Sequence, residues 1–221
     1  EAAHKKFADA WKFPDGIAEG KNGYEVTVMM NVLTDNPGEL KCMYIMGENP
    51  MISDPDLNHV EEALKNLEFL VVQDIFMTET GELADVVLPS CCYAEKDGTQ
   101  TNTERRVQLW RTAQDPPGEA KLDWQIIADI AKAMGYGEQF AWNSAEEIFN
   151  EMAALTPSYA GMDYTRLNRP EALHWPCPTK DHPGTPILHG EKFGMPDGKG
   201  LMTAIPFKYQ QERPDAEYPI L

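Results

Sequence analysis

The sequence has 221 residues, of which 42% are hydrophobic and 25% are charged, as expected for a globular protein with a real core. Its formal net charge of −17 argues against nucleic acid as a partner, because binding to phosphate depends on clustered lysine and arginine. No apolar run approaches the roughly 20 residues that a membrane helix requires, so no direct membrane insertion is expected.

The N-terminal region predicts a short helix and one segment whose type stays open. Residues 1–12 indicate an amphipathic helix through Phe7 and Trp11. The stretch 23–33 places apolar residues at alternating positions and is compatible with either a strand or the start of a helix. Residues 35–38, with the sequence Asp-Asn-Pro-Gly, predict a turn.

The next stretch predicts a strand, a tight turn and a helix. Residues 41–46 are a short apolar run that ends at Gly47, so we expect a buried strand. After the turn at 47–50, Asp54 is expected to cap a helix with Pro55 at its first position. The helix has one apolar stripe at the helical period, formed by Leu57, Val60, Leu64 and Leu67.

Two more strands complete a predicted parallel sheet. Residues 69–72 form the second strand and residues 85–90 the third. Apolar, β-branched strands that alternate with a helix indicate an α/β fold with a parallel sheet covered on both faces. Ligands of such sheets bind beyond the carboxyl ends of the strands, where this sequence has small or polar residues. These are Gly47, Glu48, Asn49, Gln73, Asp74 and Ser90.

Beyond the sheet, the helical period returns twice and is then lost. Asp123 begins a predicted helix that ends at Gly135, and Ser144 opens another through a capping box. From Thr156 onward, prolines and glycines dominate. Aromatic residues of this segment nevertheless favour docking onto other structure over disorder, namely Tyr159, Tyr164, Trp175, Phe193 and Phe207. The predicted fold class is therefore α/β, part of a parallel-sheet dinucleotide-binding domain followed by a mixed α+β segment with a proline-rich tail.

The cysteines and histidines show no metal-ligand spacing. Cys42, Cys91, Cys92 and Cys177 form no Cys-x-x-Cys pair, so an iron–sulfur or zinc site built from this segment is not expected. We interpret them as reduced structural thiols of an intracellular protein, with Cys42 in a buried strand, and expect a cytoplasmic location.

Four motifs stand in order along the chain, at residues 46–50, 72–78, 84–90 and 95–99. Together they resemble the catalytic subunit of molybdopterin oxidoreductases. Glu104-Arg105-Arg106, where the wider superfamily usually has Glu-Gly-Arg, resembles the formate dehydrogenase branch. So do the segments 175–178 and 182–186.

The resemblance implies formate/CO2 interconversion at molybdenum or tungsten held by a bis-molybdopterin guanine dinucleotide cofactor. It also implies a 4Fe-4S cluster elsewhere in the parent subunit, the remainder of that catalytic subunit and electron-transfer subunits as partners. No catalytic or metal-ligating motif of the family matches a position here. We therefore expect this chain to be an internal segment, with residues 1–92 as an α/β half-domain that holds the nucleotide and residues 93–221 as part of a second domain.

The resemblance also implies which residues meet the cofactor. It places the turn at Gly47, Glu48 and Asn49 beside the guanosine diphosphate end, where glycine allows close approach of the backbone. Ser53, just before the expected helix start, suits a phosphate group or a cap. Further positions implied at the nucleotide are Gln73, Asp74, Ile75 and Ser90, whereas Asp85 is interpreted as structural.

Asp123 has two interpretations. It could cap the helix that follows it, or, as the resemblance implies, accept hydrogen bonds from the N1–H and amino group of guanine. Likewise, Arg105 and Arg106 form either a solvated charge cluster or a fork beside a polyanionic cofactor.

Two alternatives stay open. One is a relative that uses the same cofactor on another substrate, of the nitrate reductase or formylmethanofuran dehydrogenase type, against which Glu104-Arg105-Arg106 argues. The other is a cofactor-free structural homologue like the large subunit of respiratory complex I. Five polar residues argue against this second alternative, because an empty site has no need of them: Asn49, Ser53, Gln73, Ser90 and Asp123.

Overall fold

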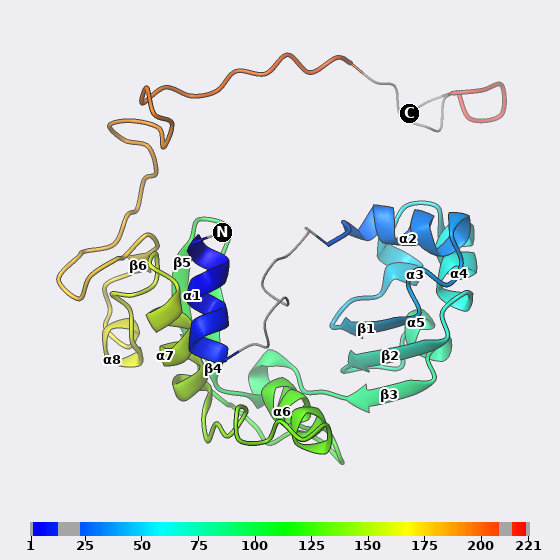
Figure 1. Cartoon of the computed structure of the whole chain (residues 1–221), viewed down its shortest axis with the longest axis horizontal. Coiled ribbons are helices and arrows are strands. Elements are labelled where there is room, and N and C mark those ends of the chain that lie inside the picture. The colour runs from blue at the N-terminus through cyan, green and yellow to red at the C-terminus, as the bar shows by residue number, and fades with distance from the viewer. Residues whose placement is uncertain (1, 13–22, 208–213, 220–221) are drawn as a thin grey trace. The chain divides into compact units, whose positions relative to one another are not determined.

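The computed structural model describes residues 2–12, 23–207 and 214–219 of the chain. It divides into two compact units, Glu1–Pro186 and Ile187–Leu221. All the helices and strands of the described residues lie in the first unit (Figure 1). The described residues of the second unit contain turns and bends but no helix or strand.

A three-stranded parallel sheet forms one part of the first unit. Its strands are β1 (Cys42–Met46), β2 (Phe69–Asp74) and β3 (Val86–Pro89), arranged in the order β1-β2-β3. Met46 pairs with Gln73 and Asp74 pairs with Pro89, so all three strands end at the same edge. The predicted parallel α/β sheet is confirmed.

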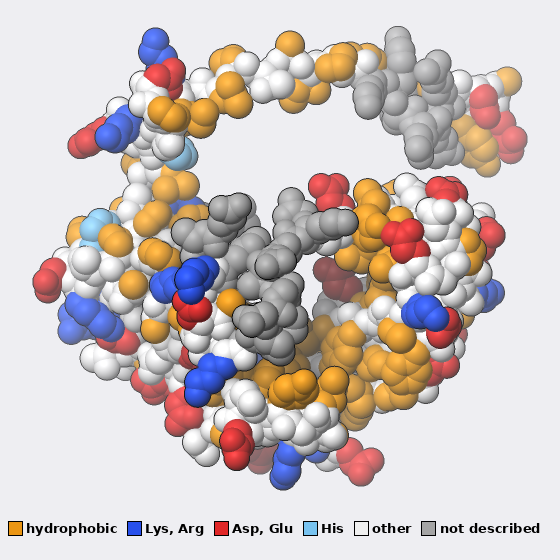
Figure 2. Space-filling view, in the orientation of Figure 1, with side chains coloured by type: hydrophobic (Ala, Val, Ile, Leu, Met, Phe, Trp, Pro, Cys, Tyr) orange, Lys and Arg blue, Asp and Glu red, His pale blue; other side chains and the backbone are white. Residues whose placement is uncertain are grey.

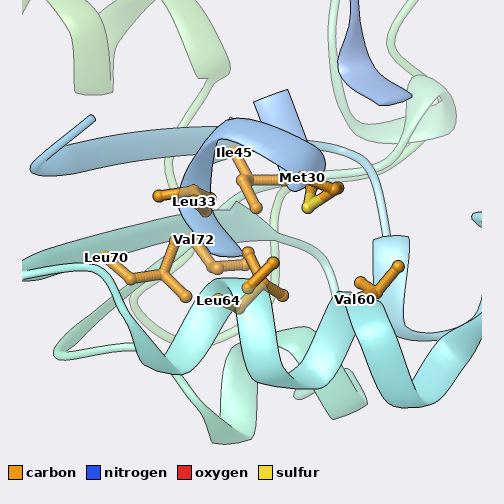
Figure 3. Close-up of a cluster of buried hydrophobic side chains, with 8 residues drawn as sticks. Met30, Leu33, Ile45, Val60, Leu64, Leu70 and Val72 are labelled. Atoms are coloured by element: carbon orange, nitrogen blue, oxygen red, sulfur yellow. The ribbon is translucent and has the colours of Figure 1, made fainter. Parts of the chain in front are cut away.

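Two helices cover one face of this sheet, α2 (Val26–Asp35) and α4 (Leu57–Lys65). Their apolar stripes pack on alternate side chains of β1 and β2, and this cluster is buried (Figure 3). The segment that could have been a strand or a helix is thus the helix α2. The cluster consists of Met30, Leu33, Ile45, Val60, Ala63, Leu64, Leu70 and Val72.

The start of α4 differs from the sequence prediction. Asp54 follows the short helix α3 (Pro50–Ser53), and its N–H donates to the carbonyl of Pro50 over 3.1 Å. The cap of α4 is instead Asp56, which has a left-handed φ of 59° and accepts from the N–H of His59. The prediction that Asp54 and Pro55 begin the helix was wrong by two residues.

The other face of the sheet has apolar side chains that remain exposed among the described residues, so the expectation that both faces would be covered was wrong for this part of the chain. Tyr44 and Met46 alternate with the buried Ile45 along β1, and Phe69 and Val86 lie on the same face by register. Hydrophobic side chains gather over these strands in the space-filling view (Figure 2). Cys42 shares this face and is exposed, so the expectation that it would be buried was wrong.

The rest of the first unit is built around an antiparallel sheet with the order β4-β5-β6. Its strands are β4 (Gly98–Thr101), β5 (Arg106–Trp110) and β6 (Leu173–His174). Helices α7 (Ala145–Leu155) and α8 (Tyr164–Leu167) share a buried cluster with it. The predicted N-terminal helix is α1 (Ala2–Trp11), whose Lys6 donates to the carbonyl of Leu155 over 2.7 Å.

The segment after Thr156 folds onto its own chain as far as Pro186. Tyr159 and Tyr164 lie within 6.5 Å of the ring of Phe149, and Tyr159 also meets Trp175. The expected docking of these aromatic rings is therefore satisfied inside the first unit. The docking of the remaining tail, in which Phe193 is exposed, stays a prediction.

Candidate functional site

The turn after β1 leaves open space beside the backbone. Gly47 has a φ of +65°, and its N–H donates to the carbonyl of Gln73 over 2.9 Å. A Cβ atom built on Gly47 would meet nothing within 4 Å, so a ligand can approach this backbone closely. The neighbouring Glu48 side chain is exposed.

Asn49 uses its side chain to join this turn to the next loop. Its Oδ1 accepts from the backbone N–H and the hydroxyl of Thr80, at 3.2 and 2.7 Å. Its Nδ2 donates to Glu79 over 2.8 Å, and this bond lowers the pKa of Glu79. Glu79 and Thr80 are the first two residues of the short helix α5 (Glu79–Glu82), so Asn49 holds two loops together at the carboxyl edge of the sheet.

Ser53 does not stand at the start of a helix. It is the last residue of α3, and its hydroxyl donates to the carbonyl of Asn49 over 3.2 Å. The argument that a helix N-terminus would place phosphate beside Ser53 was therefore wrong, since a helix C-terminus presents carbonyl groups. A contact between Ser53 and the nucleotide stays a prediction without that support.

Asp74 shapes the loop that follows β2. Its Oδ1 accepts from the N–H groups of Ile75 and Phe76, at 2.7 and 3.2 Å. This short-range pairing is typical of an Asx turn. The loop leaves Ile75, Phe76 and Met77 largely exposed beyond the strand end.

The centre of the candidate site is a hydrogen-bonded cluster around the carboxylate of Asp123. Oδ1 accepts from Gln73 Nε2 over 2.8 Å and from Ser90 Oγ over 2.5 Å. Oδ2 accepts from the ammonium group of Lys96. The Oε1 atom of Gln73 accepts in turn from the hydroxyl of Tyr44. The ends of β2 and β3, the segment that carries Lys96 and the start of the next helix thus meet at one acidic group.

Asp123 is the first residue of α6 (Asp123–Ala133), but it does not cap that helix. Leu122 occupies the cap position, and no side chain there accepts from the helix N–H groups. The interpretation of Asp123 as a helix cap was wrong, because its carboxylate is directed to Gln73, Ser90 and Lys96 instead.

The cluster keeps Asp123 ionised. Burial raises the pKa of this carboxyl, but the hydrogen bonds from Lys96, Ser90 and Gln73 together lower it below its usual value. Burial, and then the charge of Asp123, raises the pKa of Tyr44. Asp123 therefore presents a charged acceptor at neutral pH, next to a neutral phenol.

The structure brings Gln73, Ser90 and Asp123 together, and their contact with one ligand stays a prediction. The sequence analysis missed Lys96 and Tyr44. Lys96 follows the 3-10 helix η1 (Tyr93–Glu95), seven residues after the end of β3. A lysine this soon after a strand end could have been predicted to lie at the ligand edge of the sheet. Tyr44 gave no such signal, because its strand position predicted only packing.

Arg105 makes its contacts within the fold. Its guanidinium donates to the carbonyls of Trp175, of Thr185 over 2.9 Å and of Pro186 over 3.0 Å. The guanidinium carbon also lies 5.6 Å from the centre of the Trp175 ring. These contacts favour a structural role, and the fork for a polyanionic cofactor stays a prediction. Arg106 is the first residue of β5, and its N–H donates to Asn102.

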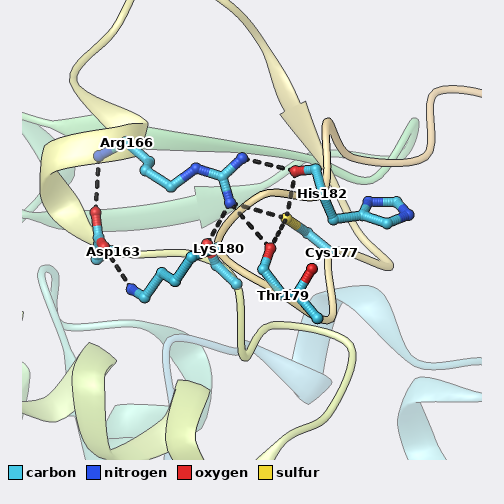
Figure 4. Close-up of polar contacts among 7 residues, drawn as sticks. Asp163, Arg166, Cys177, Thr179, Lys180 and His182 are labelled. Carbon is cyan, nitrogen blue, oxygen red and sulfur yellow. Dashed lines mark hydrogen bonds and ion pairs between the residues drawn. The ribbon is translucent and has the colours of Figure 1, made fainter.

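A second arginine, Arg166, organises the loop of residues 177–182 around the buried Cys177 (Figure 4). It donates to the carbonyl of His182 over 2.7 Å and lies 3.4 Å from the sulfur of Cys177. Asp163 caps α8 and pairs with Lys180. Cys177 is fully buried and unbridged, which agrees with a structural thiol.

A family model described as Molybdopterin oxidoreductase matches residues 16–133, which include the whole cluster around Asp123. The chain belongs to the molybdopterin oxidoreductase family. The fold supports this assignment, because it is similar to acetylene hydratase from Pelobacter acetylenicus. That likeness has a TM-score of 0.53 and 26% identity, and it covers 65% of this chain and 20% of that one.

The chain is also similar to subunits of larger enzymes. It is 51% identical to the F420-dependent formate dehydrogenase 1 subunit alpha of Methanococcus maripaludis, over 99% of this chain and 32% of the relative. It is 44% identical to the assimilatory nitrate reductase catalytic subunit of Bacillus subtilis, over 91% of this chain and 29% of the relative. The chain thus spans about a third of the length of these relatives.

Two further findings bear on the site. In the part of the chain that the structure describes, no group of three or more His, Cys, Asp or Glu side chains could hold a metal ion. Nor is any described helix both long and apolar enough to cross a membrane.

Proposed function

We propose that this chain is the nucleotide-holding segment of the catalytic subunit of a formate dehydrogenase. In this proposal residues 1–92 and the start of the following part, through Lys96 and Asp123, bind the guanine end of a molybdopterin guanine dinucleotide. The observation that supports it most is the ionised, half-buried Asp123, held by Gln73, Ser90 and Lys96 at the carboxyl edge of a parallel sheet.

The polar atoms of the cluster fit guanine. Guanine presents two N–H donors and one carbonyl on the edge that pairs with other bases. A carboxylate has about four acceptor positions, and Asp123 has one left on Oδ2. Gln73 Nε2 has a second N–H for the carbonyl, and the Ser90 hydroxyl can rotate to release a position on Oδ1 for the second donor. The open turn at Gly47 leaves room for the diphosphate.

The bound cofactor would supply the metal, molybdenum or tungsten, at which formate and CO2 are interconverted. The residues of this chain position that cofactor and take no part in the chemical step. In the proposal the remainder of the catalytic subunit supplies the catalytic residues and a 4Fe-4S cluster, electron-transfer subunits take the electrons, and the enzyme is cytoplasmic. Similarity to formate dehydrogenase alpha subunits over nearly the whole chain supports this substrate.

A second candidate is a nitrate reductase, because a catalytic subunit of that type is 44% identical to the chain. It predicts the same nucleotide site and another substrate. Assays of the complete enzyme with formate and with nitrate distinguish the two, and turnover of nitrate alone would favour the second.

Asp123→Asn in the complete subunit tests the site. Asparagine places an N–H donor among the donors of Gln73, Ser90 and Lys96, so we expect guanine nucleotide per folded subunit to fall at least about tenfold, for a loss of about 1.5–3 kcal/mol. The melting temperature of cofactor-free protein is expected to fall as well, because Asp123 also accepts three internal bonds. Nucleotide released by acid is therefore counted per folded subunit.

Asp129→Asn is the matched control. Asp129 lies on the same helix and pairs with Lys121 over 2.7 Å, but that pair is exposed. It should retain the cofactor. Full nucleotide content in the folded Asp123→Asn subunit would contradict the proposed site.

A further inference from the structure

Lys96 is the cation of the cluster, and it belongs to a different segment from the acid that it pairs with. Its ammonium group donates to Asp123 Oδ2 and, over 3.1 Å, to the carbonyl of Cys91. The pair is partly shielded, since the Lys96 side chain is 24% exposed and that of Asp123 27%. An ion pair in such a place is screened less by solvent than one on an open surface.

The neighbours of Lys96 around the carboxylate are neutral. Gln73 is fully buried and Ser90 nearly so, and each gives Asp123 one uncharged donor. Tyr44 approaches through Gln73, and burial raises the pKa of its phenol and of the Cys91 thiol, so both stay neutral as the pH falls.

Glu95, the residue before Lys96, is an acid that other groups hold. It accepts from the N–H of Cys92 over 2.9 Å and from Gln114 over 3.0 Å, and these bonds lower its pKa. Lys96 is thus the positive charge that the structure places against Asp123.

The protonation of Asp123 decides what the site can bind. An ionised carboxylate only accepts hydrogen bonds, whereas a protonated one also donates. Guanine offers N–H donors at this position, so a protonated Asp123 would oppose one donor with another. Burial favours the protonated form, and an adjacent cation opposes that tendency.

We propose that Lys96 is a positioning residue that keeps Asp123 ionised as the pH falls, and so sets the acid limit of guanine recognition. This inference depends on the proposed nucleotide site. Lys96 acts through Asp123 and does not itself recognise the base.

Affinity for GDP as a function of pH tests this role. The complete subunit, prepared without cofactor, is titrated with GDP by calorimetry between pH 5 and pH 8. The variants are Lys96→Met, Lys96→Arg and, should the methionine variant not fold, Lys96→Gln. In wild type and in Lys96→Arg the affinity should be nearly constant over this range.

In Lys96→Met and Lys96→Gln, loss of the cation should raise the pKa of Asp123. The affinity should then weaken in acid, approaching about tenfold per pH unit below that pKa, as expected for the uptake of one proton. Loss of attraction between a lysine and the diphosphate would instead lower the affinity equally at every pH. Lys121→Met is the control, because Lys121 lies two residues before Asp123 but forms an exposed pair with Asp129, so its removal should leave the profile flat.

The outcomes separate this inference from the function on which it rests. A flat profile in the folded neutral variant, Lys96→Met or its replacement Lys96→Gln, with GDP still preferred over ADP, overturns the role of Lys96 and leaves the site intact. Equal affinity of wild type for GDP and ADP at every pH would instead overturn the guanine site itself.

Discussion

Replacement of Arg105 by alanine and by glycine should separate two opposed effects at one residue. The guanidinium holds three carbonyls, those of Trp175, Thr185 and Pro186, and so fastens residues 173–186 to the start of β5. The backbone of Arg105, however, has a φ of +70°, in the left-handed region that favours glycine. Both variants lose the side-chain bonds, but only glycine relieves the backbone.

The magnitudes follow from these contacts. Hydrogen bonds to a charged group stabilise by about 1.5–3 kcal/mol each when buried, and by less here because Arg105 is half-exposed. With about 1 kcal/mol for each bond, including the small contribution of the Trp175 ring, Arg105→Ala should cost about 3 kcal/mol. Glycine recovers about 1 kcal/mol of left-handed strain, so Arg105→Gly should cost about 2 kcal/mol.

Amide hydrogen exchange in the complete subunit measures this locally. The N–H of Trp175 donates to the carbonyl of Arg105 over 3.2 Å, and that of Thr185 to His174 over 2.9 Å, so a peptide spanning 173–186 reports opening of the segment. Its slowest amides should exchange about 100-fold faster in Arg105→Ala and about 30-fold faster in Arg105→Gly. Peptides from β2 should not change. Unchanged exchange in Arg105→Ala would contradict the role of the side-chain bonds. Faster exchange in the glycine variant than in the alanine variant would contradict the relief of backbone strain.

Three further predictions concern the fold and the limits of this segment. Gly161→Ala should lower the melting temperature strongly, because a Cβ there would lie 2.1 Å from the carbonyl oxygen of Thr179; Gly98→Ala, with nothing within 4 Å, should melt like wild type. For Asp163, burial raises the pKa, but bonds from Lys180 and the Arg166 N–H lower it overall. Its contribution to stability is therefore complete above the ordinary carboxyl pKa of about 3.9 and is lost as pH falls through the lower folded value. Lys180→Met should begin acid unfolding at a higher pH, and coincident curves would argue against the pair. The purified chain alone should neither reduce a dye with formate nor show iron–sulfur absorbance, and dye reduction would show that it holds a catalytic centre.

The strands were predictable because their signal is local. Apolar, β-branched runs such as residues 69–72 suit a buried parallel sheet whatever packs on it. Whether residues 26–35 form a strand or the helix α2 was not predictable, because Val26, Val28 and Met30 alternate as in a strand. The spacing of Met30 and Leu33, which pack on the sheet, decided for a helix. The left-handed cap at Asp56 leaves no pattern in the sequence at all.

In the candidate site, parallel strand ends made Gln73 and Ser90 predictable neighbours, since such ends share one edge of a sheet. That Asp123 meets both follows from a contact between distant segments, in which Lys121 pairs with Ser90 as an isolated bridge. The family resemblance implied that Asp123 lies at the nucleotide, whereas the periodicity of the sequence predicts no contact between distant segments. The same limit explains Arg105, whose partners lie some 70 to 81 residues further along the chain.

The exposed face of the parallel sheet has a consequence for how this segment can be handled. Tyr44, Met46, Phe69 and Val86 form a flat apolar surface on strands whose opposite side is already packed. Surfaces of this kind promote aggregation when nothing covers them. Expressed by itself, the chain should therefore self-associate as its concentration rises. Polar replacements at Met46 and Val86, which leave the buried cluster unchanged, are the substitutions to try first for a monodisperse sample.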